Sequence, residues 1–235
     1  MPLFMQRSYQ KELLDQEGIP FDAIKQNMME LDMINRYLGG HVITVKGIEQ
    51  LVADRKKPLS IVEAGCGGGD NLLAIRKWLN KHHREATLTG IDINPQCIAF
   101  ARSQKKNEGI NFLCSDYRKA VFEDKPDIIF SSLFCHHYTE EELVEMLQWM
   151  HGNSKKGFFI NDLHRHPLAY YSISILTKLF SKSYLVKNDA PISVLRGFVK
   201  KDWQNLFVKA GIENYHCQWK WAFRWLITFK HEKRN

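Results

Sequence analysis

The chain has 235 residues, of which 44% are hydrophobic and 25% charged, so it can bury an ordinary core and is not of a disordered class. Its five cysteines are widely spaced without a C-x-x-C pair, which argues against a disulfide framework or a zinc site, and we expect no metal. Charge appears early in residues 1–17 and no apolar run approaches membrane-spanning length, so a cytoplasmic location is expected. The net charge of +7 indicates either a solvated basic surface or an anionic partner such as nucleic acid.

Residues 1–56 have a helical pattern throughout. Apolar residues recur at helical spacing from Phe21 to Leu38, and Gly39-Gly40 follows as a helix end would. A second helix is expected from Val42 to Asp54. These residues are therefore interpreted as an N-terminal helical cap.

A glycine-rich turn follows, between an apolar segment and another helical pattern. The apolar segment covers residues 59–63 and the helical pattern covers residues 71–81. Between them lies an E-x-G-x-G-x-G run formed by Glu63, Gly65, Gly67 and Gly69. Glycines accept positive φ and have no Cβ, so this strand, turn and helix allow the backbone to approach a nucleoside-type cofactor closely.

The spacing of these glycines favours a sulfonium cofactor over a nicotinamide or flavin. The dinucleotide fingerprint G-x-G-x-x-G/A, counted from Gly65, needs Gly or Ala where this chain has Asp70. A carboxylate at a helix N-terminus would also repel a pyrophosphate. A sulfonium cofactor carries a positive charge, an amino group and no phosphate, and Glu63 is placed to hold that amino group.

Strand and helix patterns alternate as far as residue 162. Further strands are expected at residues 86–92, 110–115, 127–132 and 157–162. The helices between them cover residues 95–107, beginning after an Asn94 cap, and 139–151, beginning with a capping box of Thr139 and Glu142. Such alternation predicts a parallel sheet with right-handed crossovers, whose ligands bind at the carboxyl ends of the strands.

Residues 163–199 interrupt this alternation. One helical face carries Leu168, Tyr171, Ile175 and Leu179, and a polar loop is expected from Asn188 to Pro191. A helix at residues 202–210 and two β-rich segments, 215–223 and 225–229, then complete the chain. The two β-rich segments are interpreted as an antiparallel pair that closes the sheet.

These motifs, over roughly residues 59–230, resemble those of class I S-adenosylmethionine-dependent methyltransferases, and at the level of shared motifs the small-molecule type of ubiquinone and menaquinone biosynthesis. The resemblance implies an α/β, Rossmann-like fold with a seven-stranded, mostly parallel sheet and an antiparallel last strand. Helices would cover both faces, with N-terminal helices and a helical insertion after strand five. One domain is expected, made of the cap (1–56), a cofactor-binding core (57–162), the insertion (163–199) and the closing helix and strands (200–235).

The resemblance also implies S-adenosyl-L-methionine as the cofactor. Glu63 would hold its amino group, Asp92 its ribose hydroxyls and Asp116 its adenine amino group. The expected cofactor-binding residues are Glu63, Gly65, Cys66, Gly67, Asp92, Ile93, Asp116, Tyr117 and Ser132. Asp92 could instead cap the helix that begins at Pro95, and Asp116 could be a turn or cap residue.

His136 and His137 follow strand four, where small-molecule methyltransferases of this class often carry a similar pair. Methyl transfer is an in-line displacement that needs the acceptor atom close to the methyl group and collinear with its bond to sulfur. Because histidine titrates near neutral pH, we expect His137, or else His136, to orient or deprotonate an acceptor hydroxyl. Either could instead be a packed histidine that hydrogen-bonds backbone.

The insertion is the expected wall of the acceptor site. The candidates for acceptor contacts are His164, Arg165, Tyr170 and Tyr171. The alternatives are an amphipathic helix packed on the domain and a membrane-surface helix, since lysines at 178, 182 and 187 flank apolar residues. The membrane is the less favoured of these.

The expected function is methyl transfer to a small-molecule acceptor, at a hydroxyl of an aromatic or lipid-like metabolite. The positive charge leaves an RNA or protein methyltransferase as one alternative. Against nucleic acid, the end of strand four lacks the Asn/Asp-Pro-Pro-Tyr type of sequence. The other alternative is a protein that binds S-adenosylmethionine without turnover. The sequence sets no expectation for the oligomeric state.

Overall fold

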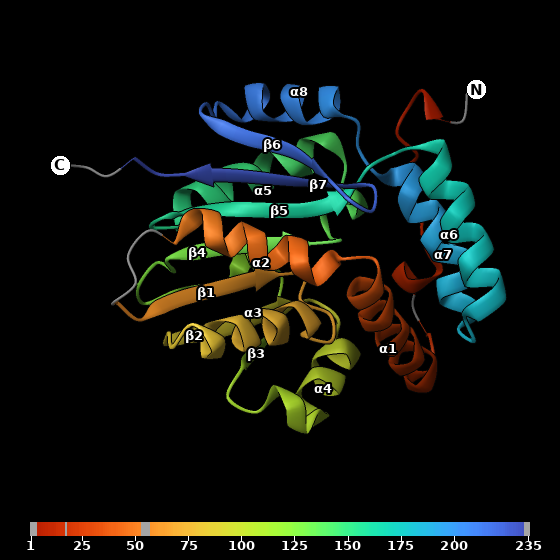
Figure 1. Cartoon of the computed structure of the whole chain (residues 1–235), viewed down its shortest axis with the longest axis horizontal. Helices are drawn as coiled ribbons and strands as arrows, with labels where there is room; N and C mark the ends of the chain where they lie inside the picture. Colours follow the sequence, from red (N-terminus) through yellow and green to blue (C-terminus); the bar gives the residue numbers. More distant parts are fainter. Residues whose placement is uncertain (1–3, 17, 53–56, 233–235) are drawn as a thin grey trace.

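The computed structural model describes residues 4–16, 18–52 and 57–232, and a seven-stranded sheet lies at its centre (Figure 1). The strand order is β3-β2-β1-β4-β5-β7-β6. The strands are β1 (Leu59–Ala64), β2 (Ala86–Asp92), β3 (Asn111–Cys114), β4 (Ile128–Ser132), β5 (Gly157–Leu163), β6 (Tyr215–Lys220) and β7 (Arg224–Lys230). Strands β1 to β5 are parallel, and β7 runs antiparallel to both β5 and β6. The predicted fold class is confirmed.

Helices cover both faces of this sheet because each carries one apolar stripe. On one face, α2 (Gly40–Leu51), α3 (Asp70–Lys81) and α4 (Pro95–Ser103) contribute buried residues to one cluster with β1 and β2. On the other face, α5 (Glu140–Asn153) and α8 (Lys200–Ala210) pack around the fully buried Trp203. Asn94 caps α4 and Thr139 forms a capping box with Glu142 at α5, as the sequence indicates.

Three further helices gather at the carboxyl ends of the parallel strands, at the right of Figure 1: α1 (Phe21–Tyr37), α6 (Pro167–Phe180) and α7 (Tyr184–Arg196). The buried carboxylate of Glu30 on α1 joins them. It accepts hydrogen bonds from the backbone N–H groups of Lys182 (2.9 Å) and Ser183 (3.1 Å), between α6 and α7, and from the hydroxyl of Ser181. The cap and the insertion therefore lie together over the end of the sheet where ligands of such folds bind.

The structure corrects two expectations for these regions. Residues 4–16, which we call the N-terminal strap, have no α-helix; they contain a short 3-10 helix at Leu13–Asp15, and Phe4 is also in 3-10 conformation. The polar loop expected from Asn188 to Pro191 lies inside α7 instead. The carboxylate of Asp189 accepts hydrogen bonds from the N–H groups of Leu13 (2.8 Å) and Leu14 (3.0 Å), and this tertiary contact offsets the helix hydrogen bond that proline removes.

Smaller differences concern element ends. The helix expected at residues 95–107 ends at Ser103 and continues as a 3-10 helix, Lys105–Asn107. Gly39 precedes α2 with a left-handed backbone, φ 78°, and Gly40 is already helical. The expected end of that helix at Asp54 lies outside the described residues. No helix in the described ranges is long and apolar enough to cross a bilayer.

Candidate active site

The glycine turn after β1 has the left-handed backbone that the sequence predicts. Gly65, Gly67 and Gly69 have φ angles of 72°, 49° and 79°. A Cβ on Gly65 would lie 2.1 Å from the ring of Phe134, which follows β4, and one on Gly67 would lie 3.2 Å from Sδ of Met28 on α1. Glycine is therefore required here both by backbone conformation and by close approach of other segments.

Asp92, at the end of β2, connects the glycine turn to the next strand. One carboxylate oxygen accepts from the N–H of Gly67 at 2.9 Å and the other from the N–H of Asn94 at 2.8 Å. Asn94 is the cap of α4, so the alternative in which Asp92 caps that helix is wrong. Burial raises the pKa of Asp92, and the two N–H donors partly offset this. Ile93 beside it is 68% exposed, which places an apolar side chain next to the acid.

Glu63 is fully buried in β1, and neither carboxylate oxygen accepts a hydrogen bond from a described residue. Burial and the neighbouring carboxylates of Asp70 and Asp92 raise the pKa of Glu63 well above its usual value, and the side chain of Asn71 offsets part of this rise. An unpartnered buried carboxyl is costly. It is the kind of group that a cationic ligand would satisfy.

Three other expected cofactor residues, Cys66, Tyr117 and Ser132, have buried side chains. The thiol of Cys66 is buried against Gly90, so only its backbone can face a ligand. Tyr117 is 3% exposed and its ring packs edge-to-face on Trp149 at 5.0 Å, so the structure places it in the core and not over an open surface. Ser132 is buried, and its hydroxyl has no hydrogen-bond partner among the described residues.

Asp116 follows β3 and acts as a cap in this structure. Its carboxylate accepts from the N–H of Arg118 at 2.9 Å and pairs with the guanidinium of Arg118 at 2.6 Å. That guanidinium holds the pKa of Asp116 below its usual value. The geometry thus matches the turn-or-cap alternative, and contact with adenine would require Asp116 to share its bonds with Arg118.

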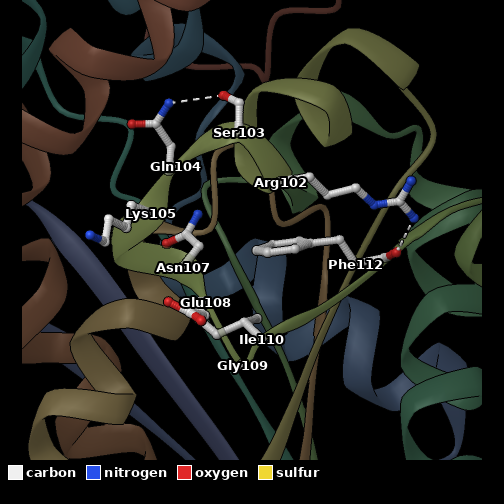
Figure 2. Close-up of a pocket in the computed structure, with 9 residues that line it drawn as sticks. All are labelled: Arg102, Ser103, Gln104, Lys105, Asn107, Glu108, Gly109, Ile110 and Phe112. Carbon is white, nitrogen blue, oxygen red and sulfur yellow. Dashed lines mark hydrogen bonds between the residues drawn. The ribbon is translucent and has the colours of Figure 1, made fainter.

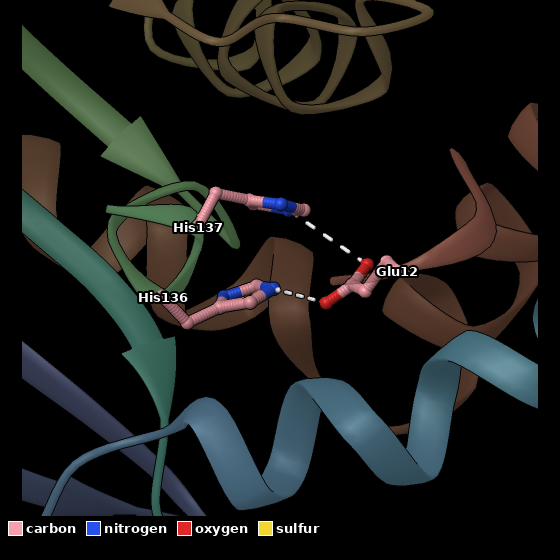
Figure 3. A group of neighbouring side chains, drawn as sticks. All are labelled: Glu12, His136 and His137. Atoms are coloured by element: carbon pink, nitrogen blue, oxygen red, sulfur yellow. Dashed lines mark ion pairs between the residues drawn. The ribbon is translucent and has the colours of Figure 1, made fainter. Parts of the chain in front are cut away.

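The two histidines lie together on the 3-10 helix Cys135–His137 that follows β4, and their ring centroids are 4.4 Å apart. His136 is 3% exposed, with Nδ1 2.8 Å from Oδ1 of Asp162 on β5. The side chain of His137 is 23% exposed, with Nδ1 3.2 Å from Oδ1 of Asp15. The Nε2 atoms of both rings face Glu12 of the strap, at 3.5 Å for His136 and 3.9 Å for His137 (Figure 3).

His136 and His137 differ in what they can do chemically. Burial alone would lower the pKa of His136, but the carboxylates of Asp162 and Glu12 outweigh it and raise that pKa to about 9. His136 is therefore a cation near neutral pH and cannot accept a proton there. His136 is thus a packed histidine, which was one of the two alternatives. Its ring binds the carboxylates of Asp162 and Glu12, whereas that alternative expected hydrogen bonds to backbone. His137 is the member of the pair with an exposed edge.

Two arginines that the sequence analysis did not single out hold the strap on these histidines. The guanidinium of Arg196 donates to the carbonyls of His136 (2.9 Å), His137 (2.7 Å) and Gln10 (2.9 Å). Arg7 on the strap donates to the carbonyl of His136 at 3.0 Å. Arg7 and His136 are 129 residues apart, so no local pattern could have indicated this contact.

The expected acceptor contacts separate into buried and exposed groups. Arg165 is 3% exposed and binds Asp202 (3.0 Å) and the carbonyl of Gly197 (2.6 Å), so it stabilises the fold and does not face a cleft. His164 accepts from the indole N–H of Trp219 at 3.2 Å, and burial with neighbouring His166 lowers its pKa to about 4. The partners of Arg165 and His164 among the described residues thus do not include His136 or His137.

The remaining candidates, Tyr170 and Tyr171, pack edge-to-face on each other at 5.2 Å on α6. The apolar face of this helix points outward: the exposed fractions are 61% for Leu168, 49% for Tyr171, 59% for Ile175 and 68% for Leu179. The alternative in which this apolar face packs on the domain is therefore wrong. α6 buries Ala169 and Thr177 instead.

A hollow of about 340 Å³ lies elsewhere, beside α4 and β3, lined by residues between Arg102 and Phe112 (Figure 2). Most of its lining precedes β3, whereas the candidate residues follow the carboxyl ends of strands. Its polar groups are largely used locally, as in the bond from Arg102 to the carbonyl of Phe112 at 2.6 Å. This hollow does not belong to the candidate site.

Residues 61–157, which contain the glycine turn, Asp92 and the histidine pair, match a family described as methyltransferase domain. These residues form a methyltransferase domain. The chain is also 32% identical over 85 residues to malonyl-[acyl-carrier protein] O-methyltransferase of Acetivibrio thermocellus, and 33% identical over 75 residues to that of Anoxybacillus flavithermus. The first match covers 36% of this chain and the second 32%, and they span only 29% and 27% of those relatives.

The fold around the methyltransferase domain is also shared with solved structures. The plantazolicin methyltransferase BpumL, crystallised with a substrate analogue and S-adenosylhomocysteine (SAH), has a TM-score of 0.62 and 20% identity, covering 84% of this chain and 72% of that one. Human N-acetylserotonin methyltransferase with S-adenosylmethionine (SAM) has a TM-score of 0.63 and 18% identity, covering 91% and 57%. At these identities the likeness concerns the fold.

Proposed function

We propose that the methyltransferase domain transfers a methyl group from SAM to an oxygen of a small-molecule acceptor. The domain's family and the fold support the reaction class. The relatives support the acceptor class, because those matched in sequence are O-methyltransferases and the structural neighbours include enzymes named for small-molecule and natural-product substrates.

The observation that carries this proposal is the buried carboxyl of Glu63 beside the glycine turn, whose pKa stays well raised because the side chain of Asn71 offsets only part of the effect of burial. The amino group of SAM is a cationic donor that would satisfy it. Asp92 already uses both oxygens on backbone N–H groups, and each oxygen keeps a lone pair for a ribose hydroxyl. The exposed side chain of Ile93 offers an apolar surface for the adenine ring. These residues fit the group.

When bound, SAM supplies a methyl group on a positively charged sulfur, and the acceptor oxygen bonds to that carbon as the carbon–sulfur bond breaks. The chain's own contribution is positioning and exclusion of water, which can account for several kcal/mol of such a barrier. Met28 of α1 covers the glycine turn and the strap covers the histidines. His137, whose edge is exposed, is the residue placed to orient or deprotonate the acceptor hydroxyl.

Isothermal titration of SAM, SAH and NADH into wild type and Asp92→Ala tests the cofactor. We expect micromolar binding of the first two to wild type, weakened at least about tenfold in the variant. Incubation with radiolabelled SAM and separate panels of phenols, carboxylic acids and transfer RNA then tests the acceptor. Preference for NADH, or label incorporated only into RNA, would overturn the proposal.

A further inference from the structure

The polar cluster of Glu12, His136 and His137 has a geometry that the proposed function uses only in part (Figure 3). Each ring turns its Nδ1 to a carboxylate, Asp162 for His136 and Asp15 for His137. This leaves both Nε2 atoms directed at Glu12. One atom from each of the three side chains lies within 4.8 Å of the other two.

This geometry is close to that of a transition-metal site. A tetrahedral ion with bonds of roughly 2.0–2.1 Å holds its ligand atoms about 3.3 Å apart. Oε1 of Glu12 lies 3.5 Å from Nε2 of His136, and Oε2 lies 3.9 Å from Nε2 of His137. Small side-chain movements would let both oxygens share the ion or turn one of them toward it. Imidazoles that bind metals commonly donate their other N–H to a carboxylate, which fixes the tautomer and the ring orientation. Both histidines have such a carboxylate here.

We propose that Glu12, His136 and His137 bind one divalent transition-metal ion, of the Zn²⁺, Fe²⁺ or Mn²⁺ class. Two imidazoles and one carboxylate suit these ions better than Mg²⁺ or Ca²⁺, which prefer oxygen ligands. Oε1 of Glu12 accepts a hydrogen bond from the hydroxyl of Ser193 at 2.7 Å, and its only cationic partners among the described residues are the two histidines. An ion at this position replaces the protons that otherwise link these three side chains.

The exposed edge of His137 indicates where the ion keeps an open coordination position, because Glu12 and His136 are 4% and 3% exposed. If the proposed function holds, that position receives the acceptor oxygen and the ion acts as a Lewis acid, lowering the pKa of the acceptor hydroxyl. This role rests on the proposed function. Binding of the ion does not rest on it.

The chain contains a second histidine–carboxylate cluster that serves as a control: Asp32, His41 and Asp70. There the Nε2 atom of the only histidine already lies 2.8 Å from Asp70. Side-chain cations also neutralise Asp32, with Nζ of Lys106 at 3.1 Å and a guanidinium nitrogen of Arg36 at 3.7 Å. This second cluster is satisfied by the protein's own groups, so we expect no ion there.

The test uses the full chain, stripped with a chelator and titrated with Co²⁺ while visible absorption is recorded, with Zn²⁺ content measured after equilibrium dialysis. We expect one ion per chain and d–d absorption bands that excess Zn²⁺ removes. Glu12→Gln and His137→Asn should each lower metal affinity by about 100-fold or more. Asp15→Asn changes the carboxylate that supports His137, which also accepts from the N–H of Glu12 and pairs with Arg196, and should lower affinity by about tenfold. His41→Asn should bind the ion like wild type.

Absence of a stoichiometric ion in wild type would overturn the metal site, as would unchanged affinity in both ligand variants or a loss confined to His41→Asn. Because Glu12 is buried, the variants are compared by circular dichroism and SAH binding. If Glu12→Gln misfolds, the wild-type titration and the His137→Asn variant still decide the question, because His137 is partly exposed and its replacement disturbs the fold less. SAH binding without metal binding would refute the ion and leave the proposed function standing, with His137 as a metal-free base. Metal binding without SAH binding would support the ion and refute the proposed function.

Discussion

The two halves of the candidate site are built in different ways. The cofactor half, with Glu63, the glycine turn and Asp92, comes from one β-α-β unit, in which Asp92 binds Gly67 only 25 residues away. The histidine half joins the strap to the end of β4 and to α7, through contacts such as that between Arg7 and His136, 129 residues apart. The first half is therefore set by local backbone chemistry and the second by tertiary packing.

The largest expected effect concerns the backbone of the cofactor half. Gly65→Ala should destabilise the protein by at least about 3 kcal/mol, because a positive φ costs about 1–2 kcal/mol and the added Cβ would lie 2.1 Å from Phe134. Gly109→Ala is the matched control, with φ 82° and nothing within 4 Å of the new Cβ, and should lose only about 1 kcal/mol. Urea unfolding measures both free energies of unfolding. Equal losses in the two variants would mean that the Phe134 ring moves aside without cost.

In the histidine half, the corresponding change is Arg196→Met. It removes the donor of the His137 and Gln10 carbonyls and one of the two arginine donors of the His136 carbonyl, which keeps Arg7, so we expect a loss of about 2–4 kcal/mol. Trypsin should then cleave the strap at Arg7 or Lys11 faster than in wild type. Lys209→Met removes only an exposed ion pair with Glu140 and should leave the unfolding midpoint and the cleavage rate nearly unchanged. Unchanged cleavage in Arg196→Met would show that the strap stays in place without the hydrogen bonds of Arg196.

The pH dependence of stability gives a smaller effect, again in the cofactor half. Because the pKa of Glu63 is raised in the folded state, the folded protein holds a proton that the unfolded chain releases, and stability falls as pH rises from the usual carboxyl value through the raised one. Glu63→Gln removes this dependence. It should raise the melting temperature near neutral pH by about 2–4 °C, as about 1 kcal/mol does at this size.

In the same Glu63→Gln variant, SAM binding should weaken, because the neutral amide no longer attracts the amino group of the cofactor. Melting curves from pH 4.5 to 8 with and without SAH measure both effects. A variant less stable than wild type over this whole range would show that Glu63 is already satisfied in the ligand-free protein.

The smallest expected effect is on the outward face of α6. Replacing Leu179 with Ser should change stability by less than about 0.5 kcal/mol, because the side chain is 68% exposed. Co-sedimentation with anionic liposomes then tests the membrane-surface alternative. Binding by wild type that is lost when Leu179, Ile175 and Leu168 are all replaced would establish a membrane contact, and equal behaviour of the two proteins would remove it.

Much of the fold was predictable because each element carries its own signal. The strands at 59–64, 86–92 and 157–163 alternate with amphipathic helices, and Asn94 and Thr139 cap helices by local hydrogen bonds. The segment around Pro191 was predicted wrongly. Locally the proline indicates a loop, yet the contacts of Asp189 with the strap keep the segment helical.

In the candidate site, too, some residues could be predicted from local sequence patterns and others depended on tertiary packing. Glu63, the glycines and Asp92 could be placed from spacing alone, because a β-α-β unit leaves little freedom in where its turn and strand ends lie. The roles of Tyr117 and Arg165 could not, because only packing decides whether a side chain at a strand end enters the core or faces a cleft. Whether the apolar face of α6 packs on the domain or faces outward was left open by the sequence for the same reason.

By itself, then, the sequence determined the doubly covered parallel sheet, the glycine turn and the pair of histidines after β4, since these depend on periodicity and on the conformational freedom of glycine. Only the tertiary structure decided that Glu12 and Asp15 meet those histidines, that His136 is buried as a cation and that Arg7 and Arg196 hold the strap in place. Contacts between residues more than a hundred positions apart depend on how finished elements pack, and no local pattern encodes that.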